Sequence, residues 1–147
     1  MYKIRSADPK DENSIRELFL EMLYAIYHTK DVEGYEDGYL DRFWEGQEDW
    51  IFVAEEDKVI AYLSVEVHHE AKEFIYLDDL SVAEPYRGQG IGTALIRKAE
   101  DYARSISIPN IVLHVEKNNL QALHLYERLG FKRERDDGER YLLRKGM

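Results

Sequence analysis

The stretch FIYLDDLSVAEPYRGQGIGT, Phe74–Thr93, decides how this sequence is interpreted. It reads as a β-strand, a Pro-Tyr corner and a loop in which glycine alternates at Gly88, Gly90 and Gly92 where a helix begins. A helix start presents backbone N–H groups without partners and the positive end of the helix dipole. Without Cβ atoms, such a loop can approach an anion closely. The stretch therefore predicts a pocket for a phosphate or pyrophosphate group.

Other interpretations of the glycines fit less well. A P-loop would carry Gly-Lys-Ser/Thr, but no lysine precedes Thr93. A dinucleotide-binding loop would place glycine where Thr93 stands, although Glu116 near the end of the next strand leaves that interpretation weakened rather than excluded. A turn without a ligand is disfavoured, because alternating glycines lower helix propensity with no packing benefit.

A second motif lies downstream of the loop. The strand IVLHV, Ile111–Val115, precedes the segment NNLQALHLYERLGF, Asn118–Phe131. Together, R-G-Q-G-I-G and N-x-x-A-x-x-L-Y-E-R-L-G-F resemble the GCN5-related N-acetyltransferase (GNAT) superfamily. The resemblance is strong from Phe74 to Phe131 and weaker over the rest of the chain. It implies an enzyme that moves the acetyl group of acetyl-CoA to an amine.

The family motifs match individual positions of this chain. The family loop, Arg/Gln-x-x-Gly-x-Gly/Ala, is met by Arg87, Gly90 and Gly92, and the Asn and Tyr of its later helix are met by Asn119 and Tyr126. Both motifs at this separation are specific for the family and for acetyl-CoA. They do not specify the acceptor.

Composition restricts the alternatives. With 147 residues, no repeats and no linker, the chain is expected to be a single GNAT domain over residues 1–147. The absence of cysteine closes a route through an acetyl-cysteine and excludes thiolate metal sites. A net charge of −10 argues against nucleic acid as a partner and favours a cationic acceptor. No apolar run reaches the ~20 residues of a membrane span, and MYKIRSADPK lacks a signal-peptide core, so we expect a cytoplasmic protein without membrane contact.

Local signals predict the remaining elements. Asp8 caps a first helix with Pro9 at its first position. Apolar residues recur on this helix at helical spacing and predict a core face: Ile15, Leu18, Phe19, Met22, Leu23 and Ile26. Further strands are expected at Tyr2–Ser6, Trp50–Glu55, Val59–Val67, Arg133–Arg135 and Arg140–Arg144, with a short helix over Gly38–Gly46. The order, β-α-α-β-β-β-α-β-α-β-β, predicts an α/β fold with a mixed sheet flanked by helices, as in the GNAT fold.

The resemblance implies contacts with acetyl-CoA. The pyrophosphate would lie on the loop amides, with the Arg87 side chain and the Thr93 hydroxyl assisting. The full loop is Arg87, Gly88, Gln89, Gly90, Ile91, Gly92 and Thr93. In the family the pantetheine arm pairs like a strand with the end of a splayed central strand, here the backbone of Leu80, Ser81 and Val82. Asn119 would hydrogen-bond this arm, or it would cap its helix.

Acetyl transfer requires a base and an acid. A lysine-like amine has a pKa near ~10.4 and must lose a proton, while the leaving thiolate needs one. Tyr126 matches the tyrosine that many family members place beside the thioester sulfur, although its helical spacing also suits a core residue. Polyamine acetyltransferases of this superfamily carry an acidic pair at this place, and Asp78 matches the member usually assigned to proton removal, so it is the first candidate base. His114 on the neighbouring strand is the rival base or a packed, hydrogen-bonded residue. No His, Asp or Glu cluster has ligand spacing, so no metal is expected.

Strand alternation assigns faces to the candidate acids. It places Asp78 on the same face as Phe74, Tyr76, Leu80 and Val82. Asp79 would then lie on the opposite face, as a contact for the amine or as part of a structural ion pair.

The acceptor side is predicted from charge and aromatic content. The segment from the first helix to the second is acidic and includes Tyr24 and Tyr27, which suits an ammonium group or, equally, a solvated surface over a packed core. A small cationic amine of the polyamine or aminoglycoside kind is the first expectation. A peptide N-terminus or lysine is the second, and a non-catalytic acyl-CoA sensor is the third. Many members of the family are dimers, so the resemblance also suggests a homodimer.

Overall fold

The structure, a computed structural model, describes residues 1–147 and contains a seven-stranded sheet in the order β1-β2-β3-β4-β5-β7-β6. The strands are β1 (Lys3–Ser6), β2 (Trp50–Glu55), β3 (Val59–His68), β4 (Phe74–Val82), β5 (Asn110–Glu116), β6 (Lys132–Asp136) and β7 (Arg140–Gly146). The helices are α1 (Glu12–Tyr27), α2 (Asp41–Glu45), α3 (Ile91–Ser105) and α4 (Leu120–Arg128), with 3-10 turns at Pro9–Asp11 and Glu84–Tyr86. The predicted order of elements is confirmed. No helix combines the length and the apolar character needed to cross a membrane.

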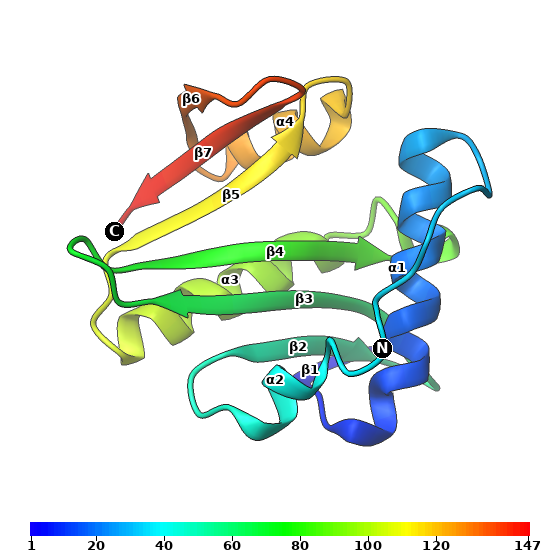
Figure 1. The fold of residues 1–147 in the computed structure, drawn as a ribbon. Coiled ribbons are helices and arrows are strands. Elements are labelled where there is room, and N and C mark those ends of the chain that lie inside the picture. The colour runs from blue at the N-terminus through cyan, green and yellow to red at the C-terminus, as the bar shows by residue number, and fades with distance from the viewer.

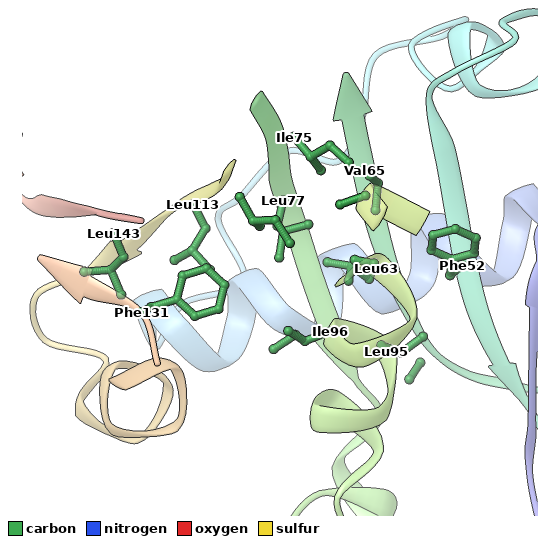
Figure 2. Packing of buried hydrophobic residues seen from close by; sticks show 14 of the residues in the cluster. Phe52, Leu63, Val65, Ile75, Leu77, Leu95, Ile96, Leu113, Phe131 and Leu143 are labelled. Atoms are coloured by element: carbon green, nitrogen blue, oxygen red, sulfur yellow. The ribbon is translucent and has the colours of Figure 1, made fainter. Parts of the chain in front are cut away.

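The sheet separates two groups of helices. Leu95 and Ile96 of α3 pack against Leu63 and Leu77 on one face, in the larger core cluster shown in Figure 2. Helix α3 passes behind β3 and β4 in Figure 1, and α4 covers the end of β5 on the same side. Helices α1 and α2 bury a smaller cluster on the other face. The sheet thus has a mainly apolar face under α3 and a more polar face under α1 and α2.

Helix α1 begins as its sequence predicts. The Asp8 side chain accepts a hydrogen bond from the Lys10 N–H, and the Asp11 side chain accepts one from the Asp8 N–H, forming a capping box at the 3-10 turn that leads into α1. Arg5 of β1 clamps Asp11 with two bonds of 2.8 and 2.9 Å. The start of α1 is therefore fastened to the sheet by charge-assisted hydrogen bonds.

The apolar face predicted for α1 is only partly core. Ile15 and Leu18 are buried, but Met22 and Ile26 in the second half of the helix line a cleft. The prediction was wrong for that half because α1 extends past the edge of the packed sheet. Periodicity identifies an apolar stripe but not whether protein or a ligand covers it.

Strands β4 and β5 separate shortly after they meet. They pair in parallel only from Ile75–Leu77 with Ile111–Leu113, although β4 continues to Val82 and β5 to Glu116. In Figure 1 the yellow strand β5 turns away toward α4, whereas the green strand β4 continues toward α1. The last residues of β4 therefore have no neighbouring strand on the β5 side, and the sheet opens there.

A β-bulge lies in β4 at the point of separation. Leu63 of β3 pairs with Leu80, and Val65 pairs with Leu77, so Ser64 alone faces both Asp78 and Asp79. The buried Ser64 Oγ accepts the Asp79 N–H at 2.9 Å, which satisfies a backbone donor that the bulge removes from the ladder.

The bulge corrects the predicted faces of β4. Asp78 and Asp79 both point toward α1 and α2, where each meets a tyrosine hydroxyl. Leu80 and Val82 pack against the α3 core rather than sharing a face with Phe74 and Tyr76. The simple alternation was wrong because the extra residue shifts every later side chain to the other face.

The bulge should depend on its serine. Ser64→Ala leaves the Asp79 N–H without a partner, and we expect a loss of about 1–3 kcal/mol in the free energy of unfolding, measured by urea denaturation. Ser105→Ala is the control, because the Ser105 hydroxyl bonds the Tyr102 carbonyl on an exposed helix end. Equal effects of the two substitutions would show that Ser64 does not hold the bulge.

Candidate active site

A cleft of about 660 Å³ opens where β4 and β5 separate. Its lining comes from α1, the end of β4, the glycine loop and α4: Met22, Ala25, Ile26, His28, Leu80, Ser81, Val82, Tyr86, Arg87, Gly88, Gly90, Ile91, Gly92, Thr93, Asn118, Asn119, Gln121, Ala122, Leu125, Tyr126 and Arg128. Both motifs recognised in the sequence therefore lie on one cavity. Its size lies within the range of small-molecule sites.

The glycine loop offers free donors at one end of the cleft. None of the backbone N–H groups from Gly88 through Thr93 donates a hydrogen bond within the protein. Gly90 is the N-cap of α3 and has φ +83°, a left-handed conformation that favours glycine. No side chain caps this helix start. The loop is therefore a set of unpaired donors at a positive helix end, as an anion site requires.

The polar side chains of the loop are less available than expected. The Arg87 guanidinium donates to the Val82 carbonyl at 2.8 Å and pairs with Glu21 of α1 at 3.3 Å, so it first serves to fasten the loop. Gln89 does not line the cleft, and its amide donates to the Pro85 carbonyl. Ser81 pairs with Tyr62 of β3, and Arg87 uses the Val82 carbonyl, so the free edge of β4 consists of the Leu80 backbone groups and the Val82 N–H.

Helix α4 forms the opposite wall of the cleft. Asn119 is its N-cap and accepts the Ala122 N–H at 3.3 Å, while also lining the cavity, so capping and ligand contact are compatible. The Tyr126 hydroxyl makes no hydrogen bond within the protein and contacts solvent, because no fully buried side-chain oxygen lacks a partner. Burial, and secondly the charge of Asp79, raises the pKa of Tyr126 to about 12. The phenol therefore keeps its proton at neutral pH.

Sequence reasoning missed part of the lining. Arg128, in the last turn of α4, lines the cleft and forms no ion pair, and His28 lines it at the end of α1. The spacing of Gln121, Leu125 and Arg128 places them on one helix face, which is the signal that could have revealed Arg128. His28 has φ +55° and gave no comparable signal.

The carboxylate pair occupies the polar face of β4. Burial, and then the charge of Asp78, raises the pKa of Asp79 to about 7, while a hydrogen bond from Tyr35 acts in the opposite direction. Tyr39 donates to Asp78 at 3.2 Å. An acid whose pKa lies near neutrality can both accept and release a proton under working conditions. Asp79 thus has the titration behaviour of a general base, the role that the resemblance implied for Asp78.

His114 belongs to a separate chain of hydrogen bonds. Its Nδ1 lies 2.7 Å from the Tyr76 hydroxyl, and its Nε2 lies 2.8 Å from Asp137 in the β6–β7 turn. Arg135 also contacts Asp137 and, together with His114, lowers the pKa of that carboxyl to about 2. The chain links the polar face of β4 to the hairpin.

A second pocket, of about 400 Å³, lies between the end of α1 and the hairpin. It is lined by Tyr27, Glu116, Asp137, Glu139 and Arg140. Of the two tyrosines expected on the acceptor side, Tyr27 lines this hairpin pocket and is half exposed, whereas Tyr24 lines neither cavity described here. Acidic groups predominate, although Arg140 adds a cation that forms no ion pair.

Comparison with known proteins assigns the family. A model described as the acetyltransferase (GNAT) family matches residues 13–131. The chain belongs to this family. The match includes the glycine loop, the splayed strands and α4, so the predicted resemblance is confirmed.

Relatives of this GNAT chain include N-acetyltransferases without an assigned substrate. It is 30% identical to an uncharacterized N-acetyltransferase of Methanocaldococcus jannaschii over 148 residues, covering 95% of this chain and 88% of that one. It is 32% identical to mycothiol acetyltransferase of Corynebacterium glutamicum over 88 residues, or 60% of this chain. The matched part is 30% of the length of that enzyme.

Solved structures share the GNAT fold. The PaiA N-acetyltransferase of Thermoplasma acidophilum, in complex with coenzyme A, superposes with a TM-score of 0.84 at 19% identity, covering 100% of this chain and 99% of that one. Naa50 of Arabidopsis thaliana, in complex with the bisubstrate analogue CoA-Ac-MVNAL, gives 0.78 at 22% identity, with 99% of each chain covered. At these identities the likeness confirms the predicted fold.

The glycine loop can be tested by one substitution. Gly90→Val should reduce coenzyme A affinity at least ~10-fold in calorimetry, because a β-branched residue is strained at positive φ and would disturb the loop donors. A Cβ at Gly90 meets no atom within 4 Å, so crowding within the protein is not the cause. Gly138→Val is the matched control: it has φ +86° and equal space, but lies in the hairpin turn. Similar affinity losses in both variants would contradict a site at Gly90.

Proposed function

We propose that this chain is an N-acetyltransferase that moves the acetyl group of acetyl-CoA directly to the primary amine of a small cationic acceptor. One observation carries the proposal: a single cleft has the unpaired amides of Gly88–Thr93 at one end and the free Tyr126 hydroxyl in its α4 wall. An anion-binding loop and a proton donor on one cavity suit a thioester carried by a pyrophosphate-containing molecule.

The proposed position of the thioester carrier follows the cleft. Its pyrophosphate lies on the loop amides, and the Thr93 hydroxyl is a further donor. Its two amide groups pair with the open edge of β4 at Leu80 and Val82, while Met22 and Ile26 cover its apolar part. Acetyl-CoA supplies an acyl group activated for attack by nitrogen. The coenzyme A found in PaiA and the analogue found in Naa50 support this choice of ligand.

The proposed transfer moves protons on both sides of the thioester. The carboxylate pair Asp78 and Asp79 removes a proton from the ammonium, and the nitrogen then forms a bond to the acetyl carbon as the carbon–sulfur bond breaks. The acylated nitrogen releases its second proton to solvent, which leaves a neutral amide. Tyr126 donates a hydrogen bond or a proton to the departing sulfur and recovers it from solvent. His114, joined to Tyr76, is the alternative base. The absence of cysteine in the chain leaves direct transfer as the proposed route.

The preference for a cationic acceptor rests on the acceptor side. Glu116, Asp137 and Glu139 surround the hairpin pocket, and Glu66 lies buried near Asp78. Tyr27 adds an aromatic face, which attracts an ammonium group by cation–π interaction. The net charge of −10 attracts cations at longer range.

A peptide N-terminus is the second candidate acceptor. The opening between the end of α1 and the hairpin provides the open surface that a peptide would need. Arg140 there forms no ion pair and could bind a carboxylate or carbonyl of a peptide-like acceptor. We rank this candidate below a small amine because acids outnumber the single cation.

A panel of amines decides between these functions. Purified protein, acetyl-CoA and each amine are mixed, and free thiol release is followed. The panel holds spermidine, kanamycin, a peptide with a free N-terminus, and an N-blocked peptide with one lysine. We expect kcat/KM at least ~10-fold higher for spermidine or kanamycin than for either peptide, with KM rising as salt increases. Faster turnover of a peptide would select the second candidate. Binding of acetyl-CoA without turnover on any amine would support a non-catalytic sensor.

Tyr126→Phe tests the proton donor. Removing only the hydroxyl should lower kcat ~10²-fold while changing coenzyme A affinity less than ~3-fold, because the phenol acts on the departing sulfur rather than on the bound carrier. Tyr102→Phe is the control, since its hydroxyl donates to the Glu48 carbonyl away from the cleft. Unchanged kcat in Tyr126→Phe would remove Tyr126 from this role.

A further inference from the structure

The loop between α1 and α2 is packed against α1 by a stack of three aromatic rings, one from α1 and two from the loop. The Phe19 and Tyr35 centroids lie 3.9 Å apart, and the Tyr35 and Tyr39 centroids lie 4.8 Å apart, with both pairs nearly parallel. Arg16 of α1 donates to the Tyr35 carbonyl at 2.7 Å and to the Glu36 carbonyl at 3.2 Å. The loop is therefore held to α1 by its backbone and by its rings.

The hydroxyl groups of this stack contact the carboxylate pair. Tyr35 donates to Asp79 Oδ2 and shares a 3.0 Å hydrogen bond with the hydroxyl of buried Tyr62. Tyr39 donates to Asp78 Oδ2 at 3.2 Å. One loop thus supplies one hydroxyl to each acid.

The second oxygen of each acid is left free. Neither Asp78 Oδ1 nor Asp79 Oδ1 makes a hydrogen bond within the protein, and no fully buried side-chain oxygen lacks a partner. Both Oδ1 atoms are therefore in contact with solvent. Each carboxylate is held by one oxygen and presents the other.

Packing alone does not account for the hydroxyls. Phenylalanine at Tyr35 would preserve the ring stack, and an apolar residue at Asp79 would avoid burying a carboxyl group. The arrangement instead keeps a costly acid and gives it a donor from a loop distant in sequence. Such an arrangement is expected where the acid is used in chemistry.

We propose that Tyr35, supported by Tyr62, is a positioning residue that holds Asp79 by Oδ2 and directs Oδ1 toward the ammonium of the acceptor. This inference rests on the proposed function, because it assigns Asp79 to the removal of the proton. Tyr39 holds Asp78 in the same way through a longer bond. The α1–α2 loop thereby takes part in transfer without touching acetyl-CoA.

The proposal predicts the direction of a pH effect. Hydrogen bonding by Tyr35 favours the charged form of Asp79, and the charge of Asp78 disfavours it. The other titratable groups around Asp79 come from the loop, β3, β4 and α4: Tyr39, Tyr62, Glu66, Tyr76, Asp78 and Tyr126. Loss of the Tyr35 hydroxyl should raise the pKa of Asp79, and loss of the Asp78 charge should lower it.

The test compares pH profiles of kcat/KM for the best amine of the panel. Tyr35→Phe should move the acid limb of the profile to higher pH by roughly one unit. The value of kcat/KM should then fall approximately ten-fold at pH values below the limb and much less above it. Asp78→Asn should move the acid limb downward. Tyr24→Phe is the matched control, because Tyr24 is a half-buried α1 tyrosine with no side-chain hydrogen bond in the protein, and it should leave the limb unmoved.

A second readout separates this inference from the proposed function. Carbon-13 NMR of the carboxyl groups, with Asp79 assigned by Asp79→Asn, follows its titration without any acceptor. If no amine is acetylated, the proposed function fails, but an upward shift of the Asp79 titration in Tyr35→Phe still supports the positioning. A folded Tyr35→Phe protein with an unmoved Asp79 titration would overturn it. So would an equal activity loss at every pH, which indicates a purely structural role.

Discussion

The brief pairing of β4 with β5 is the constraint on which the rest of the structure depends. Three residue pairs join the two strands, and beyond Leu77 and Leu113 they diverge. Divergence leaves a backbone edge open, places the start of α3 at one end of the gap, and brings α4 to its other side. The cleft, its donors and its tyrosine therefore follow from where one ladder of hydrogen bonds ends.

The same region carries a cost in stability. Asp79 has a pKa of about 7 in the folded protein, above the ~3.9 of an exposed aspartate, so the folded state binds its proton more tightly than the unfolded state. Its favourable contribution is present in full below pH ~4 and is lost as the pH rises through about 7. A residue that destabilises the fold at neutral pH, yet whose carboxylate accepts a hydrogen bond from Tyr35 and whose N–H donates to Ser64, is best understood as functional.

Much of this arrangement could be predicted from the sequence. Gly90 and Tyr126 lie in motifs specific enough to indicate the family, and regular hydrophobic patterning gave the order of elements. The bulge could not be predicted, because one inserted residue leaves no mark on composition and still moves Asp79 to the face of Asp78. The engagement of Arg87 by Glu21, and of Asp79 by Tyr35, depends on contacts between segments more than 40 residues apart, which local pattern cannot reveal.

The central claim is that the open edge of β4 and the start of α3 together hold a thioester carrier. Amide hydrogen exchange, followed by NMR with and without saturating coenzyme A, tests it most directly. The account predicts that the ligand slows exchange at Leu80, Val82 and Gly88–Thr93, while amides of the β6–β7 hairpin keep their rates. Binding that leaves the β4 edge and the glycine loop unprotected, or no binding at all, would contradict the account.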